Sequence, residues 1–103
     1  MKLVIVTVVE QFHKDVIDLF KKAGIDSFSE SDIDGYKNSS SILMASNWFS
    51  AEKGSNESNM FFSFTDEAHI EILFDLIKKL NINLETNNPI KAIVVPIERY
   101  ILT

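Results

Sequence analysis

The sequence predicts an α+β fold of the ferredoxin-like type, with strands and helices in the order βαββαβ. In this fold four strands form one antiparallel sheet, and both helices cover the same face of it. Three observations predict it. Residues 2–9 and 90–95 are apolar runs of strand length, two stretches between them have helical periodicity, and short alternating segments separate those two stretches. The length of 103 residues and the 46% hydrophobic content suit a single domain spanning residues 1–103.

The first strand and the first helix have the clearest patterns. Residues 2–9 (KLVIVTVV) are apolar on both faces, which is typical of a central strand. A helical stripe follows, made of Phe12, Val16, Leu19, Phe20 and Ala23. Gly24 stands where a helix commonly ends in the left-handed conformation.

The middle of the chain is less regular. Residues 25–34 alternate loosely and predict a half-buried strand. Residues 35–59 are rich in Ser and Asn and predict a long loop, with one possible short strand at residues 42–45. Residues 60–65 (MFFSFT) predict a strand that carries Met60, Phe62 and Phe64 on one face.

A second helix is predicted after Thr65, which we expect to be its N-cap, with Asp66 and Glu67 in the first turn. Its apolar positions cover more than half of the circumference, which indicates extra burial under a loop or a partner: Ile70, Leu73, Phe74 and Ile77, widened by Ile72, Leu76 and Leu80. The strand at residues 90–95 should end at Pro96, and residues 98–103 are expected to form a last short extended piece.

The predicted sheet would leave one apolar face uncovered. Val4, Val6 and Val8 alternate with Leu3, Ile5, Thr7 and Val9, so neither face of the first strand is polar. An exposed apolar surface of that size normally has a partner. The sequence therefore predicts a homo-oligomer.

Composition excludes several classes of protein. Without cysteine, the chain has no disulfide scaffold, thiolate zinc site or cysteine nucleophile. A net charge of −5 argues against nucleic-acid binding. No segment has the pattern of a secretory leader or the roughly 20 apolar residues of a membrane span, so we expect a cytoplasmic protein that does not insert into membranes.

Both ends of the chain resemble signal transduction proteins of the PII type. The opening resemblance is carried by Met1, Lys2, the first strand, Phe12, Val16, Ala23, Gly24 and Ile25, and the closing one by the run from Ala92 to Glu98 (AIVVPIE). The resemblance implies a non-enzymatic homotrimer whose sheets face inward and whose clefts between subunits bind adenine nucleotides. It also implies a loop, here residues 35–59, that docks on a partner protein.

The resemblance places the ligand contacts at Gly35, Asn87, Asn88 and Lys91. Lys91 matches the family's lysine, but the glycines that form the family's phosphate cradle are replaced here by Asn87-Asn88-Pro89, and proline has no N–H to donate. An adenine nucleotide is therefore a possible ligand, but this segment lacks the glycines with which the family binds its phosphates. The chain is similar to a branch with a shortened loop, whose members accompany heavy-metal efflux systems, so a membrane transporter is a possible partner.

The loop carries the expected partner contacts, Trp48, Phe49, Glu52 and Lys53. Two large aromatic side chains among polar residues are typical of a recognition site. They could equally fold back over the widened apolar face of the second helix.

Other interpretations remain open. A metal-binding, metal-tolerance protein of the CutA type would use His13, His69 or Met44, although each of these has an ordinary structural explanation. A small dimeric monooxygenase with Trp48 over a pocket is a third candidate. The acidic row Asp26, Glu30, Asp32 and Asp34 could bind a hard cation or form a solvated strand edge.

Overall fold

A computed structural model describes residues 1–36, 55–86 and 88–103. Their secondary structure follows the predicted βαββαβ order, with a short 3₁₀ turn before the first helix. The elements are β1 (Lys2–Val9), η1 (Glu10–Phe12), α1 (His13–Lys22), β2 (Ser29–Tyr36), β3 (Ser55–Thr65), α2 (Glu67–Asn83) and β4 (Lys91–Pro96).

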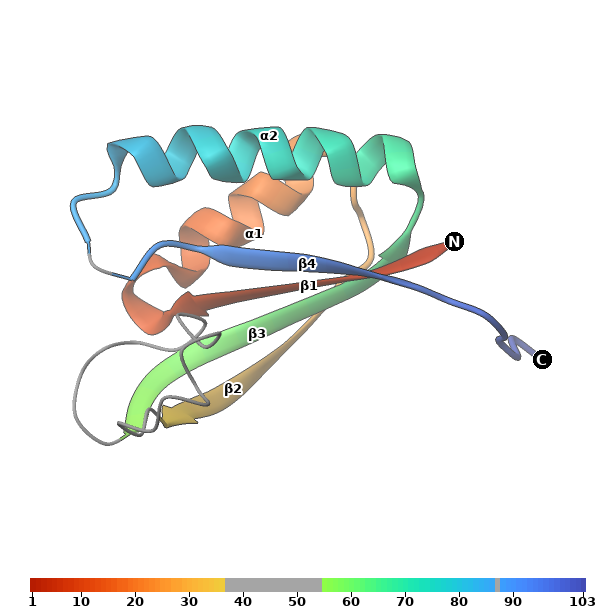
Figure 1. Cartoon of the computed structure of the whole chain (residues 1–103), viewed down its shortest axis with the longest axis horizontal. Coiled ribbons are helices and arrows are strands. Elements are labelled where there is room, and N and C mark those ends of the chain that lie inside the picture. Colours follow the sequence, from red (N-terminus) through yellow and green to blue (C-terminus); the bar gives the residue numbers. More distant parts are fainter. Residues whose placement is uncertain (37–54, 87) are drawn as a thin grey trace, which may run out of the picture.

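The four strands form one antiparallel sheet in the order β2-β3-β1-β4 (Figure 1). β1 is central, as its two apolar faces predict, and it pairs with β3 along its whole length. β2 and β4 are the two edges. The predicted fold class is confirmed.

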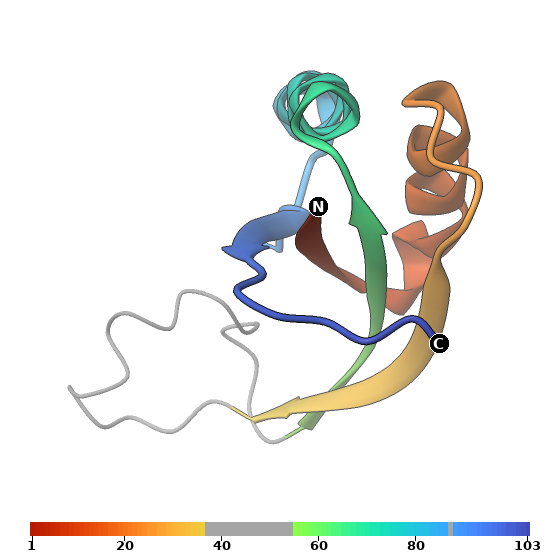
Figure 2. The ribbon, with the colours of Figure 1, turned by 90° about the vertical axis from the view of Figure 1, so that its right-hand side faces the viewer.

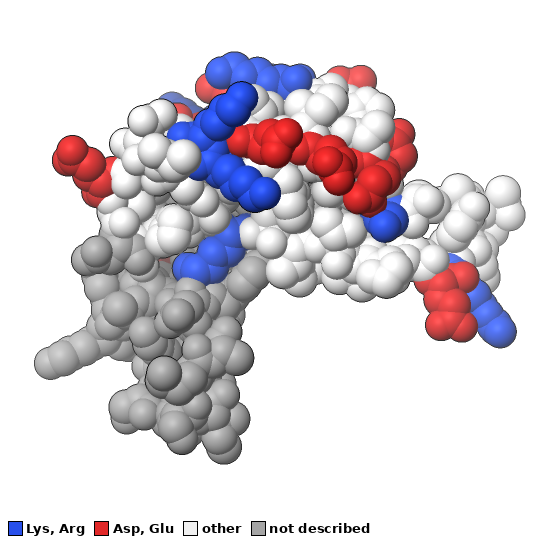
Figure 3. All heavy atoms as spheres, turned by 45° about the horizontal axis from the view of Figure 1, so that its top comes forward, with Lys and Arg blue, Asp and Glu red and all other residues white. Residues whose placement is uncertain are grey.

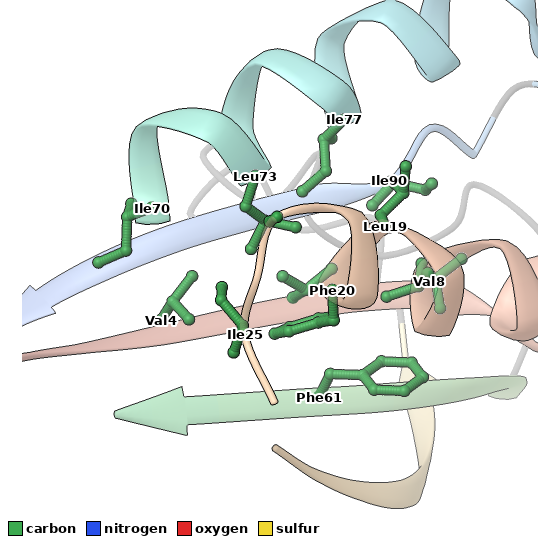
Figure 4. Packing of buried hydrophobic residues seen from close by; sticks show 13 residues of the cluster. Val4, Val8, Leu19, Phe20, Ile25, Phe61, Ile70, Leu73, Ile77 and Ile90 are labelled. Atoms are coloured by element: carbon green, nitrogen blue, oxygen red, sulfur yellow. The ribbon is translucent and has the colours of Figure 1, made fainter. Parts of the chain in front are cut away.

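Both helices lie on one side of the sheet, and the hydrophobic core fills the space between the helices and the sheet (Figures 2 and 4). Phe20 from α1, Phe61 from β3 and Leu73 from α2 are fully buried there. The ring of Phe20 stacks on Phe28 at 4.7 Å and lies 5.8 Å from Phe61, measured between ring centroids. The predicted stripes of both helices therefore pack against the same face of β1 and β3.

The end of α1 explains why residues 25–28 do not belong to β2. Gly24 has φ 78° and donates its N–H to Lys21 O, while the Ile25 N–H bonds Phe20 O at 3.0 Å. This pair of bonds is a Schellman motif, which satisfies the last carbonyls of a helix. Ile25 is 3% exposed and serves as the apolar end of that motif, so β2 begins only at Ser29.

The predicted 35–59 loop is too long at both ends. β2 continues through Gly35 to Tyr36, and β3 begins at Ser55 instead of residue 60, because residues 29–36 and 55–62 pair along their full length. The possible strand at 42–45 lies outside the described residues.

Two further expectations are corrected at helix and chain ends. Asp66, and not Thr65, is the N-cap of α2, since its carboxylate accepts the His69 N–H at 3.0 Å. Residues 98–103 form no strand; in Figure 1 this segment runs on beyond the sheet past the N-terminus, with exposed Tyr100, Ile101 and Leu102. Neither α1 nor α2, the helices of the described residues, is both long and apolar enough to cross a membrane.

Candidate functional site

The connection from α2 to β4 contains Asn88, one of the residues implied as ligand contacts, and it leads directly into another, Lys91, the first residue of β4. The side-chain amide of Asn81, near the end of α2, holds this connection by accepting the Ile90 N–H at 2.8 Å and donating to Ile90 O at 2.9 Å. The Asn88 N–H donates to Thr86 Oγ1 at 3.0 Å. Ile90 is 3% exposed. Its backbone hydrogen bonds and its buried side chain therefore both hold the turn in place.

These bonds leave residues 88–90 without a backbone donor for an anion. The N–H groups of Asn88 and Ile90 are used inside the chain, and Pro89 has none. A phosphate cradle needs several N–H groups that point at the ligand. Residues 88–90 thus do not form such a cradle, in agreement with the missing glycines.

The sheet places Gly35 and Lys91 far apart within one chain. Gly35 is near the end of β2 and Lys91 opens β4, so both stand at the same end of the sheet but on opposite edges. Three strand spacings separate these edges, which amounts to about 14 Å. One subunit does not bring the two residues into a single small-ligand site.

The sheet face turned away from the helices is apolar across three strands. The strand registers place Leu3 between Phe64 and Val95, and Ile5 between Phe62 and Ile93. Phe64 is 57% exposed, Ile93 40% and Val95 38%. The predicted grouping of Met60, Phe62 and Phe64 on one face is confirmed by the register, while Phe61 points into the core.

The helix side, in contrast, is covered with charge (Figure 3). On α2 the acidic residues Glu67, Glu71 and Asp75 come before Lys78 and Lys79, an order that complements the helix dipole. This side has the character of an ordinary solvated surface. The apolar sheet face is therefore the surface that we expect a partner to cover.

An acidic hollow lies at the end of the sheet where β2 ends and β3 begins. It has a volume of about 210 Å³ and is lined by Glu10, Asp32, Ile33, Asp34, Glu57 and Ser58. A hydrogen bond with the Glu10 carboxyl raises the pKa of Glu57, and the charges of Glu10 and Asp32 raise it further. Asp32 and Asp34 of the predicted acidic row therefore lie beside Glu57 of β3 and Glu10 of η1, whereas Asp26 lies before β2 begins.

The two histidines of the metal-tolerance interpretation lie apart. His13 begins α1, with Nε2 3.9 Å from Glu30 Oε2. His69 lies beyond the other end of α1, where its ring is next to Gly24, and its Nδ1 is 2.7 Å from Asp66 Oδ1. Since a ten-residue helix is about 15 Å long, one metal ion does not reach both.

Several implied or predicted site residues lie outside the described residues. They are Asn87 of the connection, Met44, and the expected partner contacts Trp48, Phe49, Glu52 and Lys53. Their roles remain predictions.

Sequence reasoning missed the residues that organise both regions. Asn81 and Thr86 hold the connection to β4, and Glu10, Glu57 and Asn59 surround the end of the acidic row. Asn81 interrupts the otherwise apolar end of the second helical stripe, which is a usable signal. For the three residues near the acidic row, only strand pairing reveals their proximity.

Comparisons with known proteins agree with this architecture. No protein-family model matches the sequence, and no curated protein matches it. Among solved structures, a nitrogen regulatory PII-like protein named CPII, from Thiomonas intermedia K12, is similar with a TM-score of 0.61. The match covers 97% of this chain and 94% of CPII at 12% sequence identity, and the CPII structure holds ADP, AMP and bicarbonate. The resemblance to PII-type proteins is confirmed as a likeness of fold.

Proposed function

We propose that this chain, which has the fold of a PII-like protein, is a non-enzymatic regulatory protein that works as a homotrimer. It would sense a small ligand in clefts between subunits and report it to a partner protein through the segment between β2 and β3. The observation that carries this proposal is the position of Gly35 and Lys91 on opposite edges of the sheet, at the same end. Gly35 and Lys91 can come together in one ligand site only where the β2 edge of one subunit approaches the β4 edge of another.

The apolar sheet face supplies the driving force for assembly. Burial of one large apolar side chain contributes about 1.5–3 kcal/mol, and Phe64, Ile93 and Val95 are still exposed in the single chain. Packing of three such faces around a common axis would bury them all. The charged helix side would then form the outside of the trimer.

Adenine nucleotides are the first ligands to test, because CPII holds ADP and AMP. Here the ligand would be bound chiefly through Lys91, the side chain of Asn88 and apolar contacts, since residues 88–90 offer no backbone donors. Bicarbonate belongs in the same panel because CPII holds it as well.

The partner would be bound by Trp48, Phe49, Glu52 and Lys53, and a transporter or metal efflux system is the class that the resemblance implies. Ligand binding would act by population shift, favouring the arrangement of the β2–β3 segment that the partner recognises. Partner contacts and ligand contacts would then be coupled through β2, which carries Gly35.

Light scattering coupled to size exclusion tests the assembly. The wild type should have about three times the 11.7 kDa mass of one chain, and Phe64→Glu should reduce the mass to that of one chain. Ile82→Glu is the matched control, because Ile82 is 82% exposed on α2 and should leave the trimer intact. A monomeric wild type at micromolar concentration overturns the proposal.

Isothermal titration with AMP, ADP, ATP and bicarbonate tests the ligand. Lys91→Ala should weaken binding, while Lys21→Ala on α1 should not change it. If no member of the panel binds the wild-type oligomer, the ligand part of the proposal is wrong while the assembly part stands.

A further inference from the structure

A hollow with aromatic side chains in its wall lies where β2 begins. It has a volume of about 400 Å³ and is lined by residues 26–29 and 62–64. The rings of Phe62 and Phe64 stand nearly at right angles, with their centroids 6.2 Å apart, and Phe64 is exposed. Ser63 Oγ donates to Ser27 O at 2.6 Å, which fixes the segment before β2 beside β3. The hollow, named here the aromatic hollow, is therefore a fixed feature of the β2 edge of the sheet.

The segment 98–103 carries apolar side chains that such a hollow could receive. Beyond β4 it runs past the sheet in Figure 1, and Tyr100, Ile101 and Leu102 are 62%, 88% and 77% exposed. None of the residues 98–103 lines the aromatic hollow. Three consecutive apolar side chains in water are unfavourable relative to the same side chains buried. The segment and the hollow are thus two uncovered apolar surfaces of the same molecule.

Strand register places the segment and the aromatic hollow at the same end of the sheet but on opposite edges. β4 ends at Pro96, level with Lys2 of β1 and Thr65 of β3, and residues 62–64 of β3 line the hollow next to that level. In the trimer of the proposed function, on which this inference rests, the β4 edge of one subunit approaches the β2 edge of the next. The same approach that completes the ligand site at one end of the sheet would bring the 98–103 segment to the neighbour's hollow at the other end.

The charges at the two surfaces are complementary. Arg99 precedes the three exposed apolar residues, and the exposed Asp26 lies at the aromatic hollow. Within the described residues, neither of these side chains takes part in an ion pair. A charge pair at the rim of a contact fixes its register more than it adds to affinity. Arg99 and Asp26 would therefore orient the segment in the hollow.

We propose that the 98–103 segment of one subunit docks into the aromatic hollow of the next subunit. Its three exposed apolar side chains pack against the rings of Phe62 and Phe64, and Arg99 faces Asp26 at the rim. Each subunit then gives one segment and receives one. The occupant of the hollow is thus a second copy of this chain, and all the contacts are made only in a closed ring.

Paired cysteines test this contact, since the chain has none of its own. Ser29→Cys lies at the aromatic hollow and Ile101→Cys in the segment, and both positions are exposed, so neither change should unfold the protein. A short bismaleimide should link the double variant into covalent trimers on a denaturing gel. Ser29→Cys/Ile82→Cys is the matched control, because Ile82 is exposed on α2, and it should stay at the mass of one chain.

A second measurement uses the strength of the assembly. The double variant Ile101→Ser/Leu102→Ser should raise the concentration at which the trimer half dissociates by about tenfold or more, because the burial of apolar side chains is lost. Ile82→Ser removes an exposed apolar side chain from α2 and should leave that concentration unchanged. An unchanged concentration for the double variant contradicts the proposal.

The crosslinking separates this proposal from the assembly on which it rests. A link that peptide mass mapping places inside a single chain would show that the segment folds back onto its own hollow, and equal linking in the control would show random collision; either result overturns the proposal. Absence of a link in a protein that has the trimer mass by light scattering overturns this contact and leaves the trimer intact. A wild type with the mass of one chain overturns both.

Discussion

Asn81 forms two hydrogen bonds with a single residue, Ile90, across the connection from α2 to β4. Its Oδ1 accepts the Ile90 N–H at 2.8 Å, and its Nδ2 donates to Ile90 O at 2.9 Å. The side-chain amide thus imitates the backbone of a neighbouring strand. This contact sets where β4 begins and ties the candidate ligand residues to the helix layer.

Replacement of Asn81 by alanine should therefore destabilise the fold. Both polar groups of Ile90 would lose their partners in a residue that is 3% exposed, and each such loss costs about 1–3 kcal/mol. Urea unfolding should show a loss of about 2 kcal/mol or more. Asn83→Ala is the control, because Asn83 only donates to Lys79 O at 3.3 Å on an exposed surface; equal losses in the two variants would contradict the assignment.

Gly24→Ala should destabilise the protein for two separable reasons. The positive φ of 78° costs an L-residue about 1–2 kcal/mol, and an added Cβ would lie 3.2 Å from His69 Cδ2. The double variant Gly24→Ala/His69→Ala should recover only the part of the lost stability that is due to the contact between the added Cβ and the His69 ring. Full recovery in urea unfolding would mean that the backbone conformation is not strained.

The cap of α2 should make stability depend on pH in the acid range. The backbone hydrogen bond from His69 lowers the pKa of Asp66 from its ordinary 3.8, and the side chain of His69 lowers it further. A carboxyl with a depressed folded-state pKa stabilises the fold above its unfolded pKa, and this contribution is lost as pH falls through the folded value. Asp66→Ala should thus lower the melting temperature at pH 7, and the difference from wild type should shrink in strong acid.

Asp75→Ala is the matched control, because it removes a carboxylate from the same helix at a position that does not cap the helix. Its melting temperature should follow that of the wild type at every pH. A difference for Asp66→Ala that stays constant down to the lowest pH would contradict the role of the ionised carboxylate.

Adenine nucleotides should bind with affinities that depend little on the number of phosphates. Residues 88–90 have no N–H available to an anion, so AMP, ADP and ATP should differ by less than about tenfold, or 1.4 kcal/mol. Pro89→Gly adds a donor and should favour ATP, whereas Pro96→Gly in β4 should not. An ATP affinity for the wild type hundreds of times above that of AMP would show that phosphates are held elsewhere.

The sequence by itself determined the elements whose patterns are local. The apolar run of β1, the stripes of α1 and α2 and the stop at Gly24 each depend on residues within a few positions of one another, and all four are confirmed.

The tertiary structure decided what depends on pairing between distant segments. Residues 55–59 (SNESN) have poor strand propensity, yet they extend β3 because β2 and the end of β1 supply their hydrogen-bond partners. Pairing also put Phe61 in the core and Phe64 on the open face, and separated Gly35 from Lys91 by the width of the sheet. It gathered Glu10, Asp32 and Glu57 around one hollow. Register is set by the sum of contacts across a sheet, and no local pattern of the chain contains that sum.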